Sequence, residues 1–329
     1  MTKVKSIHAF IFISLACLMF GSAARAEDIK VTLLGTSSPV LNINRFGMST
    51  LVQAGGQVLL FDVGRGAALR LHQAKVPLRD ITAIFITHLH SDHIAGLPDI
   101  YATAPLGPGG ARRVPLEIWG PQGIADVARG VELMFATNNK VRVAEKDMVQ
   151  EATTTLTHPL PSDGGPIYDK DGVRVTAFLV NHGQLTAYGY RIDYRSHTVV
   201  LSGDTTYSPN LIKYAKGVDL LVHCVAIGSR RLEAAAPELV QPRYAHLASP
   251  EMAGRILNEA RPREAVFSHI SLISSRDIQR PSHDELKSRI GALYDGPFII
   301  GEDLMSFTIT SNGVSADQYS AAKRHQEPE

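Results

Sequence analysis

Cysteine is scarce in this sequence, and no charge of one sign dominates it. Of the 329 residues only Cys17 and Cys224 are cysteines, and Cys17 lies in a segment that we expect to be removed. The thiol that is left makes no internal disulfide, so the folded chain has to be stabilised by packing. The formal net charge is +1, which does not favour a strongly basic nucleic-acid-binding protein.

Long apolar runs are also missing, apart from one near the start of the chain. Residues 7–20 are mostly apolar, follow two lysines, and precede Ala24-Arg25-Ala26, which has the small-x-small pattern of a signal-peptidase site. The run is too short and too poorly flanked to predict a stable membrane anchor. We therefore predict a signal peptide at residues 1–26 and a mature protein that is periplasmic or secreted. A weak lipoprotein-like box that ends at Cys17 leaves lipidation as an alternative.

The remaining composition is that of an ordinary globular protein. Hydrophobic residues make up 44% of the sequence and charged residues 20%, so disorder is not expected. The sequence has no clear internal repeat and no linker long enough to separate two units. We predict a single domain over residues 27–329, because a chain of this length buries a large core in one unit.

Three imidazoles and a carboxylate crowd into the segment Thr87-His88-Leu89-His90-Ser91-Asp92-His93. The segment follows Ile81–Ile86, an apolar, β-branched run that predicts a buried strand. Side chains alternate in an extended chain, so His88 and His90 point the same way and can hold one metal ion between them. The carboxylate and the third histidine follow a turn that directs them toward a second ion. A surface histidine cluster is the alternative, but so many potential ligands in one loop require a group that neutralises them.

Histidine or aspartate also ends three other predicted strands, at His182, Asp204 and His269. Small residues beside each of them let the backbone turn toward a common point at one edge of the fold. Asp62 ends a further strand, where it either forms a buried turn or orients a ligand imidazole. His223 and the cysteine after it lie inside an apolar strand, and we predict that both belong to the core.

Apolar periodicity and turn residues predict strands alternating with helices. Strands are expected at residues 29–35, 49–54, 57–62, 81–86, 116–119, 173–180, 188–193, 198–201, 218–225 and 264–269. Helices are expected at residues 66–75, 121–137 and 249–260, and from residue 282 onward. Loops around the site are expected at residues 105–115, 153–171 and 228–244. Ser249-Pro250 and Ser282-x-x-Glu285 are helix-capping patterns that mark two of the helix starts.

These segments resemble the metallo-β-lactamase superfamily. The segments that carry the resemblance are Thr87–His93, Val180-Asn-His-Gly183, Ser202-Gly-Asp-Thr205 and Phe267-Ser-His269. The resemblance implies an α/β fold of four layers, αββα, with zinc at the edge of two paired sheets. It further implies two Zn2+ ions per chain, with Asp204 as the bridge between them. The other implied metal ligands are His88, His90 and His182 for one ion, and Asp92, His93 and His269 for the other.

Three further features resemble the branch of this superfamily that contains ribonuclease Z, class III arylsulfatases and related phosphodiesterases. They are Leu33-Leu-Gly-Thr-Ser37, Gly120-Pro-Gln-Gly123 and His246 ahead of a helix. In the nuclease, a histidine at the His246 position protonates the leaving group. The nuclease also carries a long arm that grips RNA, whereas Tyr190 reaches Gly203 here through only about a dozen residues. An exported protein, moreover, meets no precursor transfer RNA.

The function predicted from the sequence is an exported binuclear zinc hydrolase that cleaves sulfate or phosphate esters, as an arylsulfatase or a phosphodiesterase. Two zinc ions would share a hydroxide that is nucleophilic near neutral pH, and the residues expected to act in catalysis are His246 and Asp92. The expected partner is a small-molecule ester, with nucleic acid disfavoured and homo-oligomerisation left open. The alternatives are a ribonuclease Z-like nuclease, a lactone or β-lactam hydrolase, and a non-catalytic zinc-binding protein.

Overall fold

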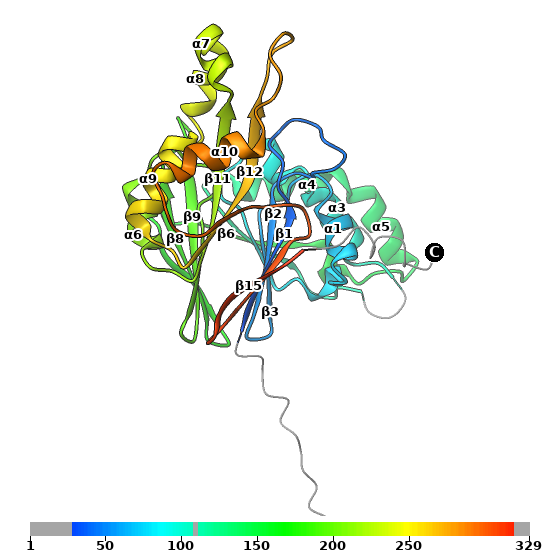
Figure 1. Cartoon of the computed structure of the whole chain (residues 1–329). Coiled ribbons are helices and arrows are strands. Elements are labelled where there is room, and N and C mark those ends of the chain that lie inside the picture. The colour runs from blue at the N-terminus through cyan, green and yellow to red at the C-terminus, as the bar shows by residue number, and fades with distance from the viewer. Residues whose placement is uncertain (1–27, 108–110, 319–329) are drawn as a thin grey trace, which may run out of the picture.

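Two β-sheets pack face to face, and helices cover the outer face of each (Figure 1). The computed structural model describes residues 28–107 and 111–318. One sheet has the strand order β15-β14-β1-β2-β3-β4-β5-β6, and the other has the order β13-β12-β11-β10-β9-β8-β7. The predicted α/β fold with four αββα layers is confirmed. The predicted signal peptide at residues 1–26, which includes Cys17, lies outside the described residues.

The first sheet and its helices come mainly from the first half of the chain. Their elements are β1 (Ile29–Gly35), β2 (Ser49–Ala54), β3 (Gln57–Phe61), α1 (Ala67–Gln73), the 3-10 helix η1 (Leu78–Asp80), β4 (Ala83–Phe85), α2 (Ser91–Ile94), α3 (Leu97–Thr103), β5 (Leu116–Gly120), α4 (Ile124–Met134), α5 (Ala136–Ala144), the 3-10 helix η2 (Gln150–Thr153) and β6 (Thr155–Pro159). The C-terminal strands β14 (Ser306–Thr310) and β15 (Gly313–Asp317) complete this sheet, because β14 pairs with β1.

The second sheet and its helices follow. Their elements are β7 (Gly165–Lys170), β8 (Val173–Val180), β9 (Ala187–Tyr194), β10 (His197–Leu201), α6 (Pro209–Ala215), β11 (Leu220–Gly228), α7 (Arg230–Ala235), α8 (Pro237–Tyr244), α9 (Pro250–Ala260), β12 (Glu264–Ile273), α10 (His283–Gly291) and β13 (Phe298–Ile300). The two predicted caps form, since the Ser249 and Ser282 side chains accept backbone N–H groups at the starts of α9 and α10. Within the described ranges, no helix is long and apolar enough to cross a membrane.

The two sheets bury a shared apolar core between them. Along β9, Tyr188, Tyr190 and Ile192 occupy alternate positions and all point into this core, as the two-residue period of a strand requires. Phe61 and Phe85 of the facing sheet stack there with ring centroids 4.9 Å apart. The opposite faces of the sheets pack under helices, with α1, α3 and α4 over one sheet and α6, α9 and α10 over the other. Since both faces of each sheet are largely covered, the strand ends are the part left to form a site.

Strand direction brings several strand ends to one edge. The strands β3 to β6 run parallel in one sheet, and β10 to β13 run parallel in the other. β8 runs in the same direction as β10, because each is antiparallel to β9. The carboxyl ends of β4, β8, β10 and β12 therefore lie at one edge of the paired sheets, where parallel α/β folds hold their sites.

Two of the predicted loops are regular structure. Residues 153–171 contain β6 and β7, which hold Pro159 and Pro166; both strands lie at the outer edges of their sheets, where a missing N–H group is tolerated. Residues 228–244 form α7 and α8, and Pro237 occupies the first turn of α8, where a helix accepts proline. Figure 1 shows α7 and α8 projecting from the body of the protein, next to the loop that follows β12.

Candidate metal centre

The seven predicted metal ligands lie together at the edge where the strand ends meet. Four of them follow β4, and the others follow β8 and β10 or lie in β12. Their ligand atoms form groups in which all atoms are within 4.8 Å of one another. The groups are His88, His90 and His182; His88, His93 and Asp204; and Asp92, His93 and His269.

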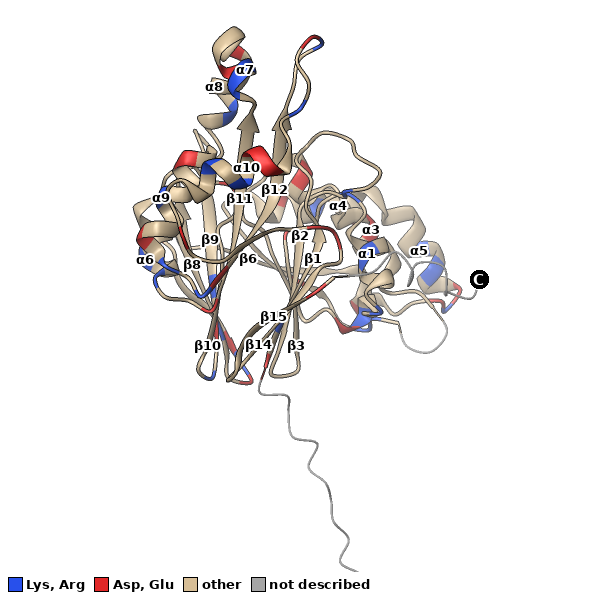
Figure 2. Ribbon diagram, viewed as in Figure 1, with Lys and Arg blue, Asp and Glu red and all other residues tan. Residues whose placement is uncertain are grey.

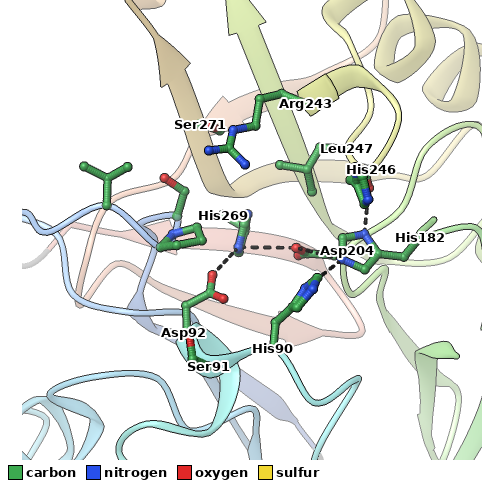
Figure 3. A pocket seen from close by; sticks show the side chains of 13 residues that line it. His90, Ser91, Asp92, His182, Asp204, Arg243, His246, Leu247, His269 and Ser271 are labelled. Atoms are coloured by element: carbon green, nitrogen blue, oxygen red, sulfur yellow. Dashed lines mark hydrogen bonds and ion pairs between the residues drawn. The ribbon is translucent and has the colours of Figure 1, made fainter. Parts of the chain in front are cut away.

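His88, His90 and His182 direct three ring nitrogens at one point. The His88 Nε2 and His90 Nδ1 atoms are 2.9 Å apart, and His182 Nε2 is 3.1 Å from the same His90 Nδ1 atom. Figure 3 shows His90 and His182 facing each other across this point. Burial lowers the pKa of all three imidazoles, so each is neutral near pH 7, which is the form that binds a metal.

Asp92, His93 and His269 form a second group beside the first. His269 Nε2 is 3.1 Å from Asp92 Oδ2, and His93 Nε2 is 3.7 Å from the same oxygen. Asp204 lies between the two groups. Its Oδ2 atom is 3.6 Å from His93 Nε2, 3.4 Å from His269 Nε2 and 4.0 Å from His182 Nε2. One carboxylate oxygen therefore reaches both groups, as a bridging ligand must.

Two of the unpaired polar atoms at this centre are ones that a cation would satisfy. His93 Nε2 and Asp204 Oδ1 are buried and have no hydrogen-bond partner among the described residues, although buried polar atoms are nearly always paired. Both face a set of imidazole nitrogens and carboxylate oxygens, which are the ligands that zinc prefers in proteins. The residues of the centre thus fit a divalent metal, typically zinc.

The electrostatics of the centre lead to the same conclusion. Burial raises the pKa of Asp204, but His269 and His93 outweigh it and hold the pKa of this carboxyl well below its usual range. Burial lowers the pKa of His93, but Asp62 and Asp204 outweigh it and raise that pKa well above its usual value. The carboxylates therefore favour positive charge inside a buried site, and a divalent cation bound there would provide it in place of the His93 proton.

Asp62 orients one of the histidines in this loop. Its Oδ2 atom accepts a 2.7 Å hydrogen bond from His93 Nδ1, and its Oδ1 atom accepts one of 2.8 Å from the backbone N–H of Thr87. Asp62 has a φ of 57°, in the left-handed region, so the chain bends sharply where it carries this carboxylate. Of the two roles considered for Asp62, orientation is the one found, because His93 is left with Nε2 pointing at the centre.

His246 contacts the centre through both its backbone and its side chain. Its carbonyl accepts a 2.8 Å hydrogen bond from His182 Nδ1, which leaves His182 Nε2 to face the metal position. Its own Nδ1 atom donates to the Pro242 carbonyl at 2.9 Å, so its Nε2 atom is the one left for chemistry. The exposed ring lies over Gly183, where a Cβ atom would be 2.7 Å from Nε2. Glycine at position 183 therefore makes room for His246.

An irregularity in β12 directs His269 toward the site. Cys224 of β11 pairs with Ser268 of β12, but the next residue, Val225, pairs with Ile270, so His269 is left out of the ladder. His269 has a φ of 46°, which is uncommon outside glycine. Bulges of this kind re-aim a side chain beside a functional site. No feature of the sequence around His269 predicted this one.

His223 and Cys224 belong to the core, as predicted. Both are buried in β11, and neither joins a group of potential metal ligands in the part of the chain that the structure describes. Burial lowers the pKa of His223 to about 3 and raises that of Cys224 to about 12, so both side chains are uncharged near neutral pH. The Thr205 backbone N–H donates to Cys224 Sγ at 3.3 Å. This contact fixes the loop that carries Asp204.

A cavity of about 270 Å³ opens over the centre (Figure 3). Its walls include Arg243 and His246 beyond the centre, and Ser38 and Val40 from the segment that precedes β2. The predicted loops 105–115 and 153–171 contribute none of the lining residues in their described parts. Arg243 comes from the expected 228–244 segment, but the contribution of residues 38–40 was missed, because only the folded chain brings them here.

Known proteins are similar in sequence to this chain. A family model described as the β-lactamase superfamily domain matches residues 58–270. A protein named ribonuclease Z from Mycolicibacterium gilvum is 33% identical over 282 residues, which cover 84% of this chain and 94% of that protein. The chain belongs to the metallo-β-lactamase superfamily. Another ribonuclease Z, from Mycobacterium bovis, is 38% identical over 203 residues, which cover 60% of this superfamily member and 70% of that protein.

Solved structures show the same fold at lower identity. A metallo-β-lactamase fold protein from Bacillus subtilis has a TM-score of 0.66 and 22% identity, and the match covers 85% of this chain and 99% of that one. The short form of human tRNase Z has a TM-score of 0.60 and 21% identity, with coverages of 84% and 98%. The protein is thus a hydrolase of the metallo-β-lactamase superfamily that has ribonuclease Z among its relatives.

The prediction about its partner is wrong. We expected a small-molecule ester and disfavoured nucleic acid, but the relatives that match most of this chain are named ribonuclease Z. The connection between β9 and β10 is indeed short, since only residues 195–196 separate the two strands. This short connection does not exclude RNA, because α7 and α8 form another projection, and Arg243 of α8 lines the cavity.

Proposed function

We propose that this protein is a zinc-dependent phosphodiesterase that cleaves RNA, with two zinc ions held by the seven side chains described above. The position of Asp204 carries the proposal, because one of its oxygens lies within 4.0 Å of ligand nitrogens in both groups. The relatives named ribonuclease Z support RNA as the substrate class. Those names lend no support to the arylsulfatase prediction, so the phosphodiester is the ester that we retain.

The chain would divide the work between holding the metal and handling the substrate. Zinc bound at such a centre would lower the pKa of a bound water and neutralise charge that develops on phosphoryl oxygens. His88, His90 and His182 would hold one ion, and Asp92, His93 and His269 the other. Asp92 is 4% exposed and its Oδ2 atom faces His269 Nε2. Its contribution to catalysis is therefore through the metal and not through direct contact with the substrate.

His246 is the residue we assign to the leaving group. Its Nδ1 atom donates to the Pro242 carbonyl, which leaves Nε2 as the ring nitrogen available at the wall of the cavity. A proton carried on Nε2 would be donated from there to the departing oxygen of the cleaved ester. Arg243 lines the same cavity, and its planar guanidinium suits the non-bridging oxygens of a phosphate.

A substrate panel tests the proposal. Zinc-loaded protein would be given a single-stranded RNA, bis(4-nitrophenyl) phosphate, 4-nitrophenyl sulfate and a chromogenic cephalosporin. We expect cleavage of the RNA and of the synthetic diester, with loss of both activities in Asp204→Ala. Faster turnover of the sulfate or of the cephalosporin than of either phosphodiester would overturn the proposal. Tight zinc binding without any turnover would leave the non-catalytic alternative.

We also propose that the chain is exported and processed after Ala26. The charged start, the short apolar run and the Ala-x-Ala site support this. N-terminal sequencing of the protein recovered from its producing cells should find Glu27 as the first residue. An intact Met1, or a mature chain that begins at a lipidated Cys17, would contradict it.

A further inference from the structure

A second groove continues from the cavity above the metal centre. Residues 37–45 on one side and residues 270–283 on the other enclose a groove of about 480 Å³. Ser38, Val40 and Ser271 line both the cavity and the groove, so the two spaces share a wall. A substrate longer than the group at the metal centre therefore has a direct path along which to extend.

The lining of this groove offers hydrogen-bond donors and positive charge, and it contains no carboxylate. Its polar residues are two arginines, one histidine, two asparagines and three serines, and its other residues are aliphatic. Arg45 is anchored there, because it donates to the Thr36 hydroxyl and to the Gly301 carbonyl. Such donors bind an anion, and the two carboxylates that interact with His283, those of Glu302 and Asp284, lie outside the lining.

Arg280 is the exposed arginine of this set. It makes no hydrogen bond or ion pair with any residue that the structure describes. Arginines on nearby elements are already paired, since both Arg230 and Arg289 contact Glu233 and Glu251. The guanidinium of Arg280 therefore keeps all its donors for a ligand.

We propose that the groove between residues 37–45 and 270–283 is a second phosphate subsite, in which Arg280 binds an RNA phosphate next to the one being cleaved. The inference rests on the proposed phosphodiesterase function and adds to it the part of the molecule that selects a polymer. A diester with one phosphate fills only the cavity, whereas an RNA strand places consecutive phosphates in the cavity and in the groove. Figure 2 shows charged residues of both signs on α7, on α8 and on the loop that follows β12, whereas the residues that line the groove include no carboxylate.

The test separates the groove from the metal centre. Cleavage of bis(4-nitrophenyl) phosphate reports on the centre alone, and a single-stranded RNA of twelve nucleotides is added as a competitor over a range of salt concentrations. The variants are Arg280→Gln and Arg276→Gln, and the second is the matched control. Arg276 is exposed on the same segment but does not line the groove.

We expect Arg280→Gln to leave turnover of the synthetic diester unchanged and to raise the inhibition constant of the RNA about tenfold. The slope of the logarithm of RNA affinity against the logarithm of salt concentration should become shallower by about 0.7, which is the value for one lost phosphate contact on a single strand. Arg276→Gln should behave like the wild type. A merely structural role for Arg280 would alter diester turnover and not the salt slope.

Two results would overturn the inference. One is an Arg280→Gln variant that binds the RNA with the wild-type affinity and salt slope, and the other is an Arg276→Gln variant that is equally impaired. If the zinc-loaded wild type cleaves no phosphodiester at all, the proposed function fails instead. The groove is then judged by fluorescence anisotropy of the labelled RNA on the same three proteins, with the same expected order of affinities.

Discussion

The cavity has a floor, which is the metal centre, and a rim, which is formed by the residues around its opening. The two regions differ in how firmly their side chains are held. On the floor, His88 and His93 are fully buried and Asp204 is 4% exposed, and Asp62 and the His246 carbonyl fix the far nitrogens of two ligands. On the rim, His246 and Arg243 are exposed, and so is Arg280 in the adjoining groove. A metal centre needs fixed ligand geometry, whereas a polymeric substrate needs side chains that can adjust to it. The two regions should therefore respond differently to mutation.

The largest effect is expected on the floor, from Asp204→Ala. Removing the carboxylate that reaches both ligand groups should lower the zinc content from about two ions per chain to one or none. Activity on every substrate should be lost together with the metal. Elemental analysis of protein purified with excess zinc measures the first effect and the diester assay the second. A variant that retains both ions would show that Asp204 does not bridge them.

The next effect is expected on the rim, from His246→Ala. Both zinc ions should stay bound, while the rate on substrates with a poor leaving group falls roughly 10²- to 10⁴-fold, because no proton reaches the departing oxygen. The loss should shrink as the leaving group becomes more acidic. A series of aryl phosphodiesters at matched zinc occupancy measures this trend. Parallel lines for the wild type and the variant would refute the proton-donor role.

A smaller effect on the floor is expected from Asp62→Asn. An amide that donates to His93 Nδ1 forces the ring proton onto Nε2, where it opposes metal binding. Zinc affinity should fall by roughly 10- to 100-fold, as is usual when a partner that orients a ligand is lost. Competition with a chelator measures this affinity. Asp80→Asn is a suitable control, because Asp80 is exposed and contacts only Arg79 by an ion pair.

The smallest effect is expected at Cys224, whose thiol should not react with a thiol reagent in the folded protein. It is 2% exposed, and burial raises its pKa to about 12, so at pH 8 it is an uncharged thiol that no reagent reaches. A chromogenic disulfide should titrate less than about one-tenth of a thiol per folded chain that begins at Glu27, and one thiol after denaturation. Fast labelling of the native protein would mean that β11 does not bury Cys224 in solution.

Local patterns predicted the parts of the site that depend on neighbours in sequence. Thr87–His93 was recognisable because its four potential ligands follow one strand within a few positions. His182, Asp204 and His269 could be proposed because each comes at or near the end of an apolar run, and strand ends meet at an edge. The αββα layering came from the resemblance that these residues completed.

Other parts depend on contacts between residues that are distant in sequence, and these were missed. Prolines and glycines in residues 153–171 indicated a loop, but an edge strand accepts both. Pro237 and Pro242 made a helix at α8 look unfavourable from the sequence, although Pro237 lies in the first turn of that helix. Residues 38–40 reach the cavity, and His269 takes a left-handed backbone, because of how the strands pair. Strand pairing is not visible in the sequence next to these residues.

The edge strand β6 also affects how copies of this chain behave in concentrated solution. Leu160 donates its N–H to Gly120 of β5, and because backbone groups alternate along a strand, the nitrogen of Pro159 faces outward. That nitrogen carries no hydrogen, so the exposed side of β6 lacks one donor that another chain would need to add a strand. Edge-to-edge polymerisation is therefore disfavoured on this side of the sandwich, and a proline that is not one of the metal ligands favours solubility.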